Sequence, residues 1–238
     1  MQHLLRPALI HLRPYVPGRA GPPADPGGVM LASNENPRGP SPRAIQEMAE
    51  ALGSVHRYPD FSAQRLREQL ARRWHLTPEH VLVGNGSGLI IAAVARALIN
   101  PGDEGLVMTP SFSSYQQAIA IMGGRVRELP LREDQFLELR EILAGLTPWT
   151  KLLYLCNPNN PTGSTLPPVL WHQLFDQLPP TTVVVVDEAY AEYASPPTFA
   201  SAIPWVSDQR PLLVLRTFSK VYGLAGLRIG YALGPPPL

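Results

Sequence analysis

Short apolar runs recur along the chain and predict a series of buried β-strands. Seven such runs stand at residues 81–83, 106–109, 126–131, 152–156, 183–186, 212–215 and 229–233, and most of them are continuous rather than alternating. A continuous run is typical of a strand that is covered on both faces, and therefore of a mostly parallel sheet between helices. The last run follows its predecessor with no clear helix between them, so this strand could be antiparallel.

Helical patterns separate several of the predicted strands. Ser41 followed by Pro42 is typical of an N-cap and a first helical position, and Ser62 is predicted to cap a second helix. Apolar residues recur at helical spacing in two further segments, 89–99 and 115–122. Together these patterns predict an α/β fold, a three-layer sandwich with a mostly parallel sheet of about seven strands.

The length of 238 residues corresponds to one large domain, or to one domain and a fragment of a second. The 28 prolines are unevenly spread, and residues 1–30 are rich in proline and glycine. We therefore expect an extended N-terminal arm with little regular structure over residues 1–30 and a single large domain over residues 31–238.

Charge and composition exclude several classes of protein. With 20 Lys and Arg against 19 Asp and Glu, the net charge of +1 gives no reason to expect a nucleic-acid or anionic-membrane partner. No apolar stretch approaches the roughly 20 residues of a membrane span, so a soluble, cytoplasmic protein is expected. The six histidines are scattered, which predicts no metal site, and Cys156 lies in an apolar run typical of a buried structural thiol.

In open α/β sheets, ligands bind beyond the carboxyl ends of the strands, so the residues that follow each strand are the candidates for chemistry. Residues 84–88 (Gly-Asn-Gly-Ser-Gly) open directly into a helix, which favours either an anion site or an ordinary tight turn. Residues 157–163 (Asn-Pro-Asn-Asn-Pro-Thr-Gly) form either a rigid turn or a support that holds one side-chain amide at a fixed point.

Two further strand ends carry charged groups. Asp187 ends an all-valine run, so it either caps a helix or requires a partner for a buried charge. Lys220 follows another strand, with Thr217 and Ser219 before it and Arg228 after it, and these are donors that suit a phosphate. A lysine for a Schiff base, a carboxylate for a pyridine nitrogen and a set of phosphate donors match the requirements of pyridoxal 5'-phosphate (PLP).

Six stretches, in order along the chain, carry a resemblance to a known family. They are residues 34–42, 57–60, 83–87, 157–163, 187–190 and 217–231. With these stretches the sequence resembles the PLP-dependent aminotransferases of fold type I, class I/II, and among them most closely those that act on histidinol phosphate.

The resemblance implies roles for individual residues. Lys220 would form the Schiff base with the cofactor and later move the substrate proton, and Asp187 would pair with the pyridine nitrogen. Asn160 and Tyr190 would hydrogen-bond the phenolic oxygen of the cofactor. The phosphate would lie among small residues, hydroxyls and one guanidinium: Gly86, Ser87, Gly88, Thr217, Ser219 and Arg228.

The resemblance also implies a partner. Phe112 would lie against the face of the cofactor ring, and Tyr58 would reach the phosphate of the neighbouring subunit in a homodimer. Residues 1–40 would wrap around that subunit. The sequence departs from the family at Gly88-Leu89, where an acidic or polar residue usually stands, so looser anchoring of the cofactor is expected.

The implied activity is transamination between an L-amino compound, L-histidinol phosphate, and a 2-oxo acid such as 2-oxoglutarate. Aromatic aminotransferases and phosphothreonine decarboxylases share the motifs. Family members continue into a small domain that supplies a carboxylate-binding arginine, so the chain is expected to be an incomplete copy of a longer enzyme or a non-catalytic remnant that binds the cofactor. A nicotinamide dehydrogenase is disfavoured because Gly84, Gly86 and Gly88 do not give G-x-G-x-x-G.

Overall fold

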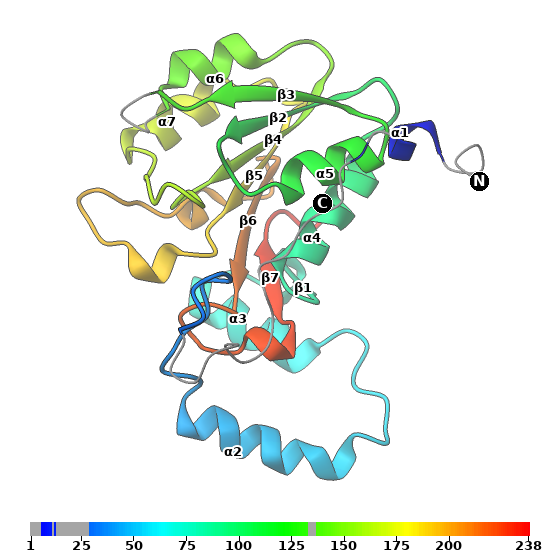
Figure 1. Ribbon diagram of the computed structural model, residues 1–238, viewed down its shortest axis with the longest axis vertical. Coiled ribbons are helices and arrows are strands. Elements are labelled where there is room, and N and C mark those ends of the chain that lie inside the picture. Colours follow the sequence, from blue (N-terminus) through cyan, green and yellow to red (C-terminus); the bar gives the residue numbers. More distant parts are fainter. Residues whose placement is uncertain (1–5, 11, 13–28, 133–136) are drawn as a thin grey trace.

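The computed structural model describes residues 6–10, 12, 29–132 and 137–238, and a seven-stranded sheet forms its centre (Figure 1). The strands are β1 (Val81–Gly84), β2 (Glu104–Thr109), β3 (Arg125–Pro130), β4 (Thr150–Cys156), β5 (Val183–Asp187), β6 (Leu212–Thr217) and β7 (Gly230–Leu233). Their order across the sheet is β1-β7-β6-β5-β4-β2-β3. Only β7 runs antiparallel to its neighbours, β1 and β6. The predicted seven-stranded, mostly parallel sheet is therefore confirmed, including the possibility that the last strand is antiparallel.

Helices cover both faces of this sheet (Figure 1). On one face lie α4 (Ser87–Leu98) and α5 (Ser114–Ile121), which pack side by side. On the other face lie α3 (Gln64–Trp74), α6 (Leu139–Gly145) and α7 (Val169–Gln177). The two predicted helical segments 89–99 and 115–122 correspond to α4 and α5.

Successive residues of the central strands contribute to opposite cores. In β4, Leu152 and Tyr154 pack with α4 and α5, whereas Leu153 and Leu155 belong to the core under α3, α6 and α7. All four side chains are buried. This arrangement explains why the strand sequences are apolar without alternation, because neither face of the strand meets water. The buried Cys156 ends β4, as expected for a structural thiol.

Helix α2 (Pro42–Ala51) stands apart from the sheet and none of its residues is buried (Figure 1). Its predicted cap is confirmed, since the Ser41 hydroxyl accepts a hydrogen bond from the Ala44 amide at 3.2 Å. The remaining short helices are α1 (Pro7–Ile10) and the 3-10 turns Leu52–Ser54, Pro78–His80, Ala191–Tyr193, Ile203–Trp205 and Ala225–Leu227.

The predicted cap of the next helix is wrong. Helix α3 begins at Gln64 rather than directly after Ser62, and the amide of its first residue is capped by Asp60. The Asp60 carboxylate accepts hydrogen bonds from the Gln64 amide at 2.7 Å and from the Ser62 amide at 2.9 Å. A carboxylate has two charged oxygens and is a stronger acceptor than a hydroxyl, so Ser62 becomes a donor to the same group.

The expected N-terminal arm lies mostly outside the described residues. Its described part contains the single helical turn α1, which packs near α5. Within the described ranges, no helix combines the length and the hydropathy that crossing a membrane requires.

We predict that Leu155→Ala lowers the free energy of unfolding by about 2–5 kcal/mol, because it leaves a cavity in the central strand of a doubly covered sheet. Urea denaturation followed by circular dichroism measures this loss. Leu82→Ala is the matched control, since Leu82 also lies on a strand but is 49% exposed, and it should cost much less. Equal losses in the two variants would contradict a core centred on β4.

Candidate active site

Asp187 is the last residue of β5 and faces the α4/α5 side of the sheet. It continues the alternate positions of Val183 and Val185, which pack with those helices. One carboxylate oxygen accepts a hydrogen bond from the Tyr115 hydroxyl at 2.7 Å, and the other accepts one from the Ala189 amide at 3.0 Å. Burial raises the pKa of Asp187, whereas these two hydrogen bonds and the charge of Lys220 act against that rise.

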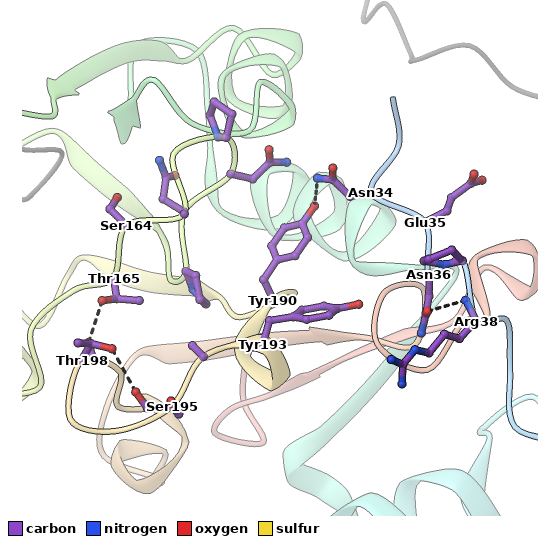
Figure 2. Close-up of a pocket in the computed structure, with 17 residues that line it drawn as sticks. Asn34, Glu35, Asn36, Arg38, Ser164, Thr165, Tyr190, Tyr193, Ser195 and Thr198 are labelled. Atoms are coloured by element: carbon purple, nitrogen blue, oxygen red, sulfur yellow. Dashed lines mark hydrogen bonds between the residues drawn. The ribbon is translucent and has the colours of Figure 1, made fainter. Parts of the chain in front are cut away.

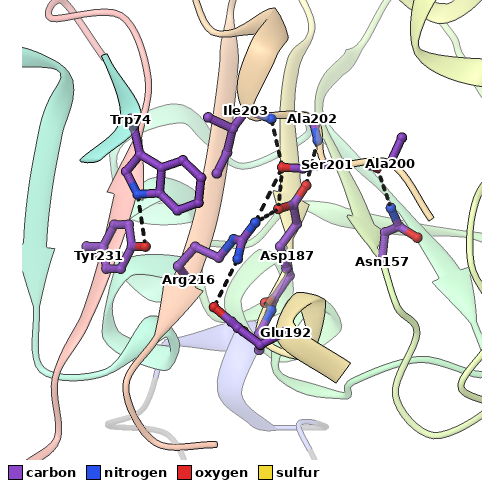
Figure 3. Close-up of polar contacts among 12 residues, drawn as sticks. Trp74, Asn157, Asp187, Glu192, Ala200, Ser201, Ala202, Ile203, Arg216 and Tyr231 are labelled. Carbon is purple, nitrogen blue, oxygen red and sulfur yellow. Dashed lines mark hydrogen bonds and ion pairs between the residues drawn. The ribbon is translucent and has the colours of Figure 1, made fainter. Parts of the chain in front are cut away.

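Glu188 follows immediately, and its partners Arg216, Ser201 and Ala202 (labelled in Figure 3) are very different from those of Asp187. Its carboxylate forms an ion pair with Arg216 at 2.6 Å and accepts hydrogen bonds from the Ser201 hydroxyl at 2.8 Å and the Ala202 amide at 2.6 Å. Arg216 also pairs with Glu192 at 3.0 Å. Asp187, in contrast, makes no ion pair within 4 Å with any residue that the structure describes, so its buried charge lacks a directly contacting cation.

Lys220 lies in the loop after β6, close to the N-terminal segment. Its ammonium donates a hydrogen bond to the Ser33 carbonyl at 2.8 Å and lies 5.5 Å from the centre of the Tyr190 ring. Burial lowers the pKa of Lys220, and the positive charge of Arg228 lowers it further, while Glu35 and Asp187 oppose this shift. An amine with a lowered pKa is more readily deprotonated, and therefore more nucleophilic, near neutral pH.

A cavity of about 890 Å³ opens beside Tyr190 (Figure 2). It is enclosed by residues 34–38, by part of the 158–165 loop and by residues of the 190–198 segment. Of the sequence-predicted site residues, Asn160 and Tyr190 line it. The Tyr190 hydroxyl accepts a hydrogen bond from the Asn34 amide at 3.0 Å, so the N-terminal segment closes one side of the cavity.

The 157–163 loop is a turn that is held by its own side chains, and it also places one asparagine at the cavity. Asn157 and Asn159 stabilise the turn: the Asn157 side-chain oxygen accepts from the Leu166 amide at 2.9 Å, and that of Asn159 accepts from the Ser111 hydroxyl at 2.7 Å. The third asparagine, Asn160, lines the cavity. Two asparagines therefore hold the loop that carries the third.

Two closely packed glycines and several hydrogen-bond donors lie together at the N-terminus of α4. Gly86 has a φ of +77°, and a Cβ on it would lie 2.7 Å from an Arg228 nitrogen. A Cβ on Gly230 would lie 2.5 Å from the Ser87 amide nitrogen, so β7 approaches the helix start as closely as only glycine permits. Arg228 also donates to the Ser219 hydroxyl at 3.5 Å. A helix N-terminus, a guanidinium and a hydroxyl thus form one cradle suited to an anion.

The remaining predicted site residues are Thr217, Phe112, Gly88 and Tyr58, and the structure does not bring all of them to the cluster formed by Asp187, Lys220 and the cradle at the start of α4. The Thr217 hydroxyl accepts a hydrogen bond from the Ser219 amide at 3.1 Å, and Phe112 packs edge-on against Tyr115 with ring centres 5.6 Å apart. Gly88 is exposed in the first turn of α4. Tyr58 is fully exposed and is not brought to the cluster within this chain.

Sequence reasoning missed three residues that contact the predicted ones: Ser33, Asn34 and Tyr115. Ser33 directly precedes the 34–42 motif and Asn34 is its first residue, but nothing in that motif shows that it lies beside Lys220. Tyr115 lies on the buried face of α5 together with Ala118 and Ile119. A tyrosine on such a face needs a partner for its hydroxyl, and this was the one sequence signal that could have indicated its role.

The model of the aminotransferase class I and II family matches residues 26–238, and the chain belongs to that family. It is 40% identical over 239 residues to the histidinol-phosphate aminotransferase of Moorella thermoacetica and 39% identical over 232 residues to the aromatic amino acid aminotransferase of Thermobifida fusca. Each alignment covers 98% of this chain. The chain spans 62% and 64% of the length of these two relatives, respectively.

A solved structure has the same fold. The histidinol-phosphate aminotransferase of Sinorhizobium meliloti, determined in complex with pyridoxal-5'-phosphate, superposes with a TM-score of 0.80 at 32% identity. The match covers 86% of this chain and 55% of that one. The fold expected from the resemblance is therefore confirmed.

We predict that Arg216→Met lowers the free energy of unfolding by about 3–5 kcal/mol at neutral pH, because it leaves the buried Glu188 carboxylate without its cation. Burial already raises the pKa of Glu188, and loss of Arg216 removes the main opposing influence. The carboxyl of the variant should then protonate as the pH falls, so the loss of stability should shrink on acidification.

Urea denaturation at neutral and mildly acidic pH measures both effects. The double variant Glu188→Gln/Arg216→Met removes both charges and should be less destabilised than Arg216→Met alone. A single variant as stable as the unmutated protein, or one whose deficit grows on acidification, would disprove the assigned ion pair.

Proposed function

We propose that the protein is a PLP-dependent aminotransferase in which Lys220, Asp187 and Tyr190 perform the chemistry. The observation that carries the proposal is the coexistence of three features at one edge of the sheet. These are a buried carboxylate with no contacting cation at Asp187, an amine of lowered pKa at Lys220, and an anion cradle at the start of α4.

These features fit PLP in charge and in chemistry. The buried Asp187 carboxylate suits a protonated ring nitrogen, which would supply the missing cation. The cradle of Gly86, Ser87, Ser219 and Arg228 suits a phosphate dianion. Family membership and the PLP-bound neighbour support the same cofactor.

Each residue then has a defined task. Bound PLP supplies an electron-accepting ring that makes the Cα–H bond of the amino compound acidic. Lys220 Nζ would bond to the cofactor carbonyl carbon, with the carbonyl oxygen leaving as water, and would be released when the amino compound takes its place. The freed amine would then carry the proton between Cα and the cofactor. Asp187 would hold the proton on the ring nitrogen, and Asn160 and Tyr190 would donate hydrogen bonds to the phenolic oxygen. Phe112 would pack against the ring face.

The phosphate donors complete the binding site. Arg228, the hydroxyls of Ser87, Thr217 and Ser219, and the amides of the 86–88 turn bind the phosphate. We infer that Gly88, in place of a polar residue, leaves the cofactor less firmly held. Residues 31–238 form the cofactor-binding domain in this proposal.

A second copy of the chain is part of the proposal. Tyr58 is 102% exposed and Phe61 is 105% exposed, in the segment that connects α2 to α3. A tyrosine in this position is free to reach the phosphate of a neighbouring subunit, as the family resemblance implies. We therefore infer a homodimer whose sites are shared.

The amino donor that we propose is L-histidinol phosphate, and the acceptor is a 2-oxo acid such as 2-oxoglutarate. The cavity beside Tyr190 has a mixed lining, in which amide and hydroxyl groups stand among prolines, tyrosines and an alanine. The side chains of Asn34, Asn160, Ser164 and Thr165 supply polar groups that suit a polar substrate. The relative from Moorella supports this choice. An aromatic amino acid is the second candidate, because the Thermobifida relative is almost equally similar.

We predict that Lys220 is the single point of covalent attachment. The chain contains only two lysines, Lys151 and Lys220, so Lys151→Ala is a matched control for Lys220→Ala. Incubation with PLP, borohydride reduction and peptide mass spectrometry should find the label at Lys220 in the unmutated protein and in Lys151→Ala. Lys220→Ala should carry none. A label at Lys151, or no label in the unmutated protein, would refute the assignment.

We predict that kcat/KM for L-histidinol phosphate exceeds that for L-phenylalanine by at least about tenfold, because a site whose polar groups hydrogen-bond one substrate discriminates against another that leaves those groups unpaired. The assay measures glutamate formed from 2-oxoglutarate, with Lys220→Ala as the blank. The opposite preference would identify an aromatic aminotransferase. Binding of PLP with no amino transfer from either donor would indicate a cofactor-binding remnant.

A further inference from the structure

We propose that Tyr115 is a positioning residue for Asp187: the Tyr115 hydroxyl favours the ionised carboxylate and fixes its orientation for the cofactor ring nitrogen. The inference rests on the proposed function and extends it to a residue outside the family motifs considered above. It follows from the hydrogen bond of 2.7 Å between two buried side chains that lie 72 positions apart in the sequence.

The Tyr115 ring is held on two sides. Its face stacks on Tyr154 with ring centres 4.8 Å apart and an interplanar angle of 16°, while Phe112 meets it edge-on at 85°. Tyr154 is itself anchored, because its hydroxyl donates to the Ile91 carbonyl at 2.9 Å. The Tyr115 hydroxyl therefore has little freedom to turn away from Asp187.

Each carboxylate oxygen of Asp187 accepts one hydrogen bond and can accept another. Tyr115 occupies one oxygen and the Ala189 amide the other. Each oxygen keeps a further lone pair, so the carboxylate can still accept a proton-bearing ring nitrogen. Ala189 is a backbone donor from the next turn, and Tyr115 is thus the only described side chain that donates a hydrogen bond to Asp187.

Tyr115 also remains a donor over a wide pH range. Burial and the Asp187 charge raise the pKa of the Tyr115 hydroxyl well above its ordinary value. Among the groups around Asp187, burial raises the pKa of the Cys156 thiol to about 12 and raises those of the Tyr154 and Tyr190 phenols. These phenols and this thiol therefore stay protonated near neutral pH.

The structure offers a matched pair of variants. Tyr115→Phe removes the hydroxyl bound to Asp187, and Tyr154→Phe removes a second buried hydroxyl from the same ring stack that is bound to backbone instead. Both variants keep the aromatic packing. A purely structural role for Tyr115 predicts similar behaviour of the two variants, whereas a positioning role predicts that only Tyr115→Phe affects Asp187.

The first measurement needs no cofactor. Carbon NMR of protein labelled at the aspartate carboxyl carbons follows the titration of Asp187, with Asp187→Asn identifying its signal. We expect Tyr115→Phe to raise the pKa of Asp187, because the hydrogen bond that lowers it is lost. Tyr154→Phe should leave this titration unchanged.

The second measurement is the affinity for PLP, followed by the absorbance of the bound cofactor. Tyr115→Phe should weaken binding by about tenfold or more, as expected for a hydrogen bond to a charged group, and Tyr154→Phe should not. In an Asp187→Asn background, Tyr115→Phe should have little further effect, because the two residues act through one interaction.

The outcomes separate the two proposals. An unchanged Asp187 titration and unchanged PLP affinity in Tyr115→Phe, with normal binding by the unmutated protein, would overturn the inference and leave the proposed function intact. Equal losses in Tyr115→Phe and Tyr154→Phe would also overturn it in favour of packing. Failure of the unmutated protein to bind PLP would overturn both.

Discussion

Two adjacent buried carboxylates, Asp187 and Glu188, set the constraint on which the site depends. A buried charge is tolerated only when it is paired or hydrogen-bonded, and the end of β5 must satisfy two such charges at once. The structure turns them to opposite sides. Glu188 is neutralised by Arg216, while Asp187 receives only neutral donors in direct contact. The ion pair of Glu188 stabilises the fold, whereas Asp187 leaves one negative charge available for a ligand.

The Glu188–Arg216 pair also connects the strands that carry the chemistry. Glu188 follows β5 directly after Asp187, and Arg216 lies on β6, four positions before Lys220. Trp74 of α3 covers the guanidinium, with its ring centre 5.1 Å away, so the pair is closed off from water (Figure 3). The ion pair thus ties the end of β5, which carries Asp187, to β6, which leads to Lys220. This arrangement separates the residues that support the site from those that would act in it.

The fold was largely predictable because its signal is local. Apolar runs marked all seven strands, and they are clearest in β4 and β5, whose residues are almost all buried. The run of the edge strand β3 is interrupted by the exposed Arg127 and Glu128. Helix starts were less predictable. Ser41 caps α2 as expected, but Asp60 rather than Ser62 caps α3, because the competition between two nearby acceptors is decided by charge and loop geometry. A sequence pattern contains both candidates and does not rank them.

The residues at the strand ends of the candidate site were predictable, because they follow from the topology of the sheet. The contacts that join the sheet to its covering helix and to the N-terminal segment were not. Asp187 and Lys220 both follow parallel strands, whose carboxyl ends meet at one edge of a sheet, so their proximity could be expected. Contacts of Lys220 with Ser33 and of Tyr190 with Asn34 join residues 187 and 156 positions apart, and no spacing rule relates them. The hydrogen bond from Tyr115 to Asp187 likewise joins a covering helix to the strand beneath it. Such contacts are determined by how the layers pack. The residues at the strand ends therefore include Asp187 and Lys220, but they do not include Ser33, Asn34 and Tyr115, which hold the site residues in place.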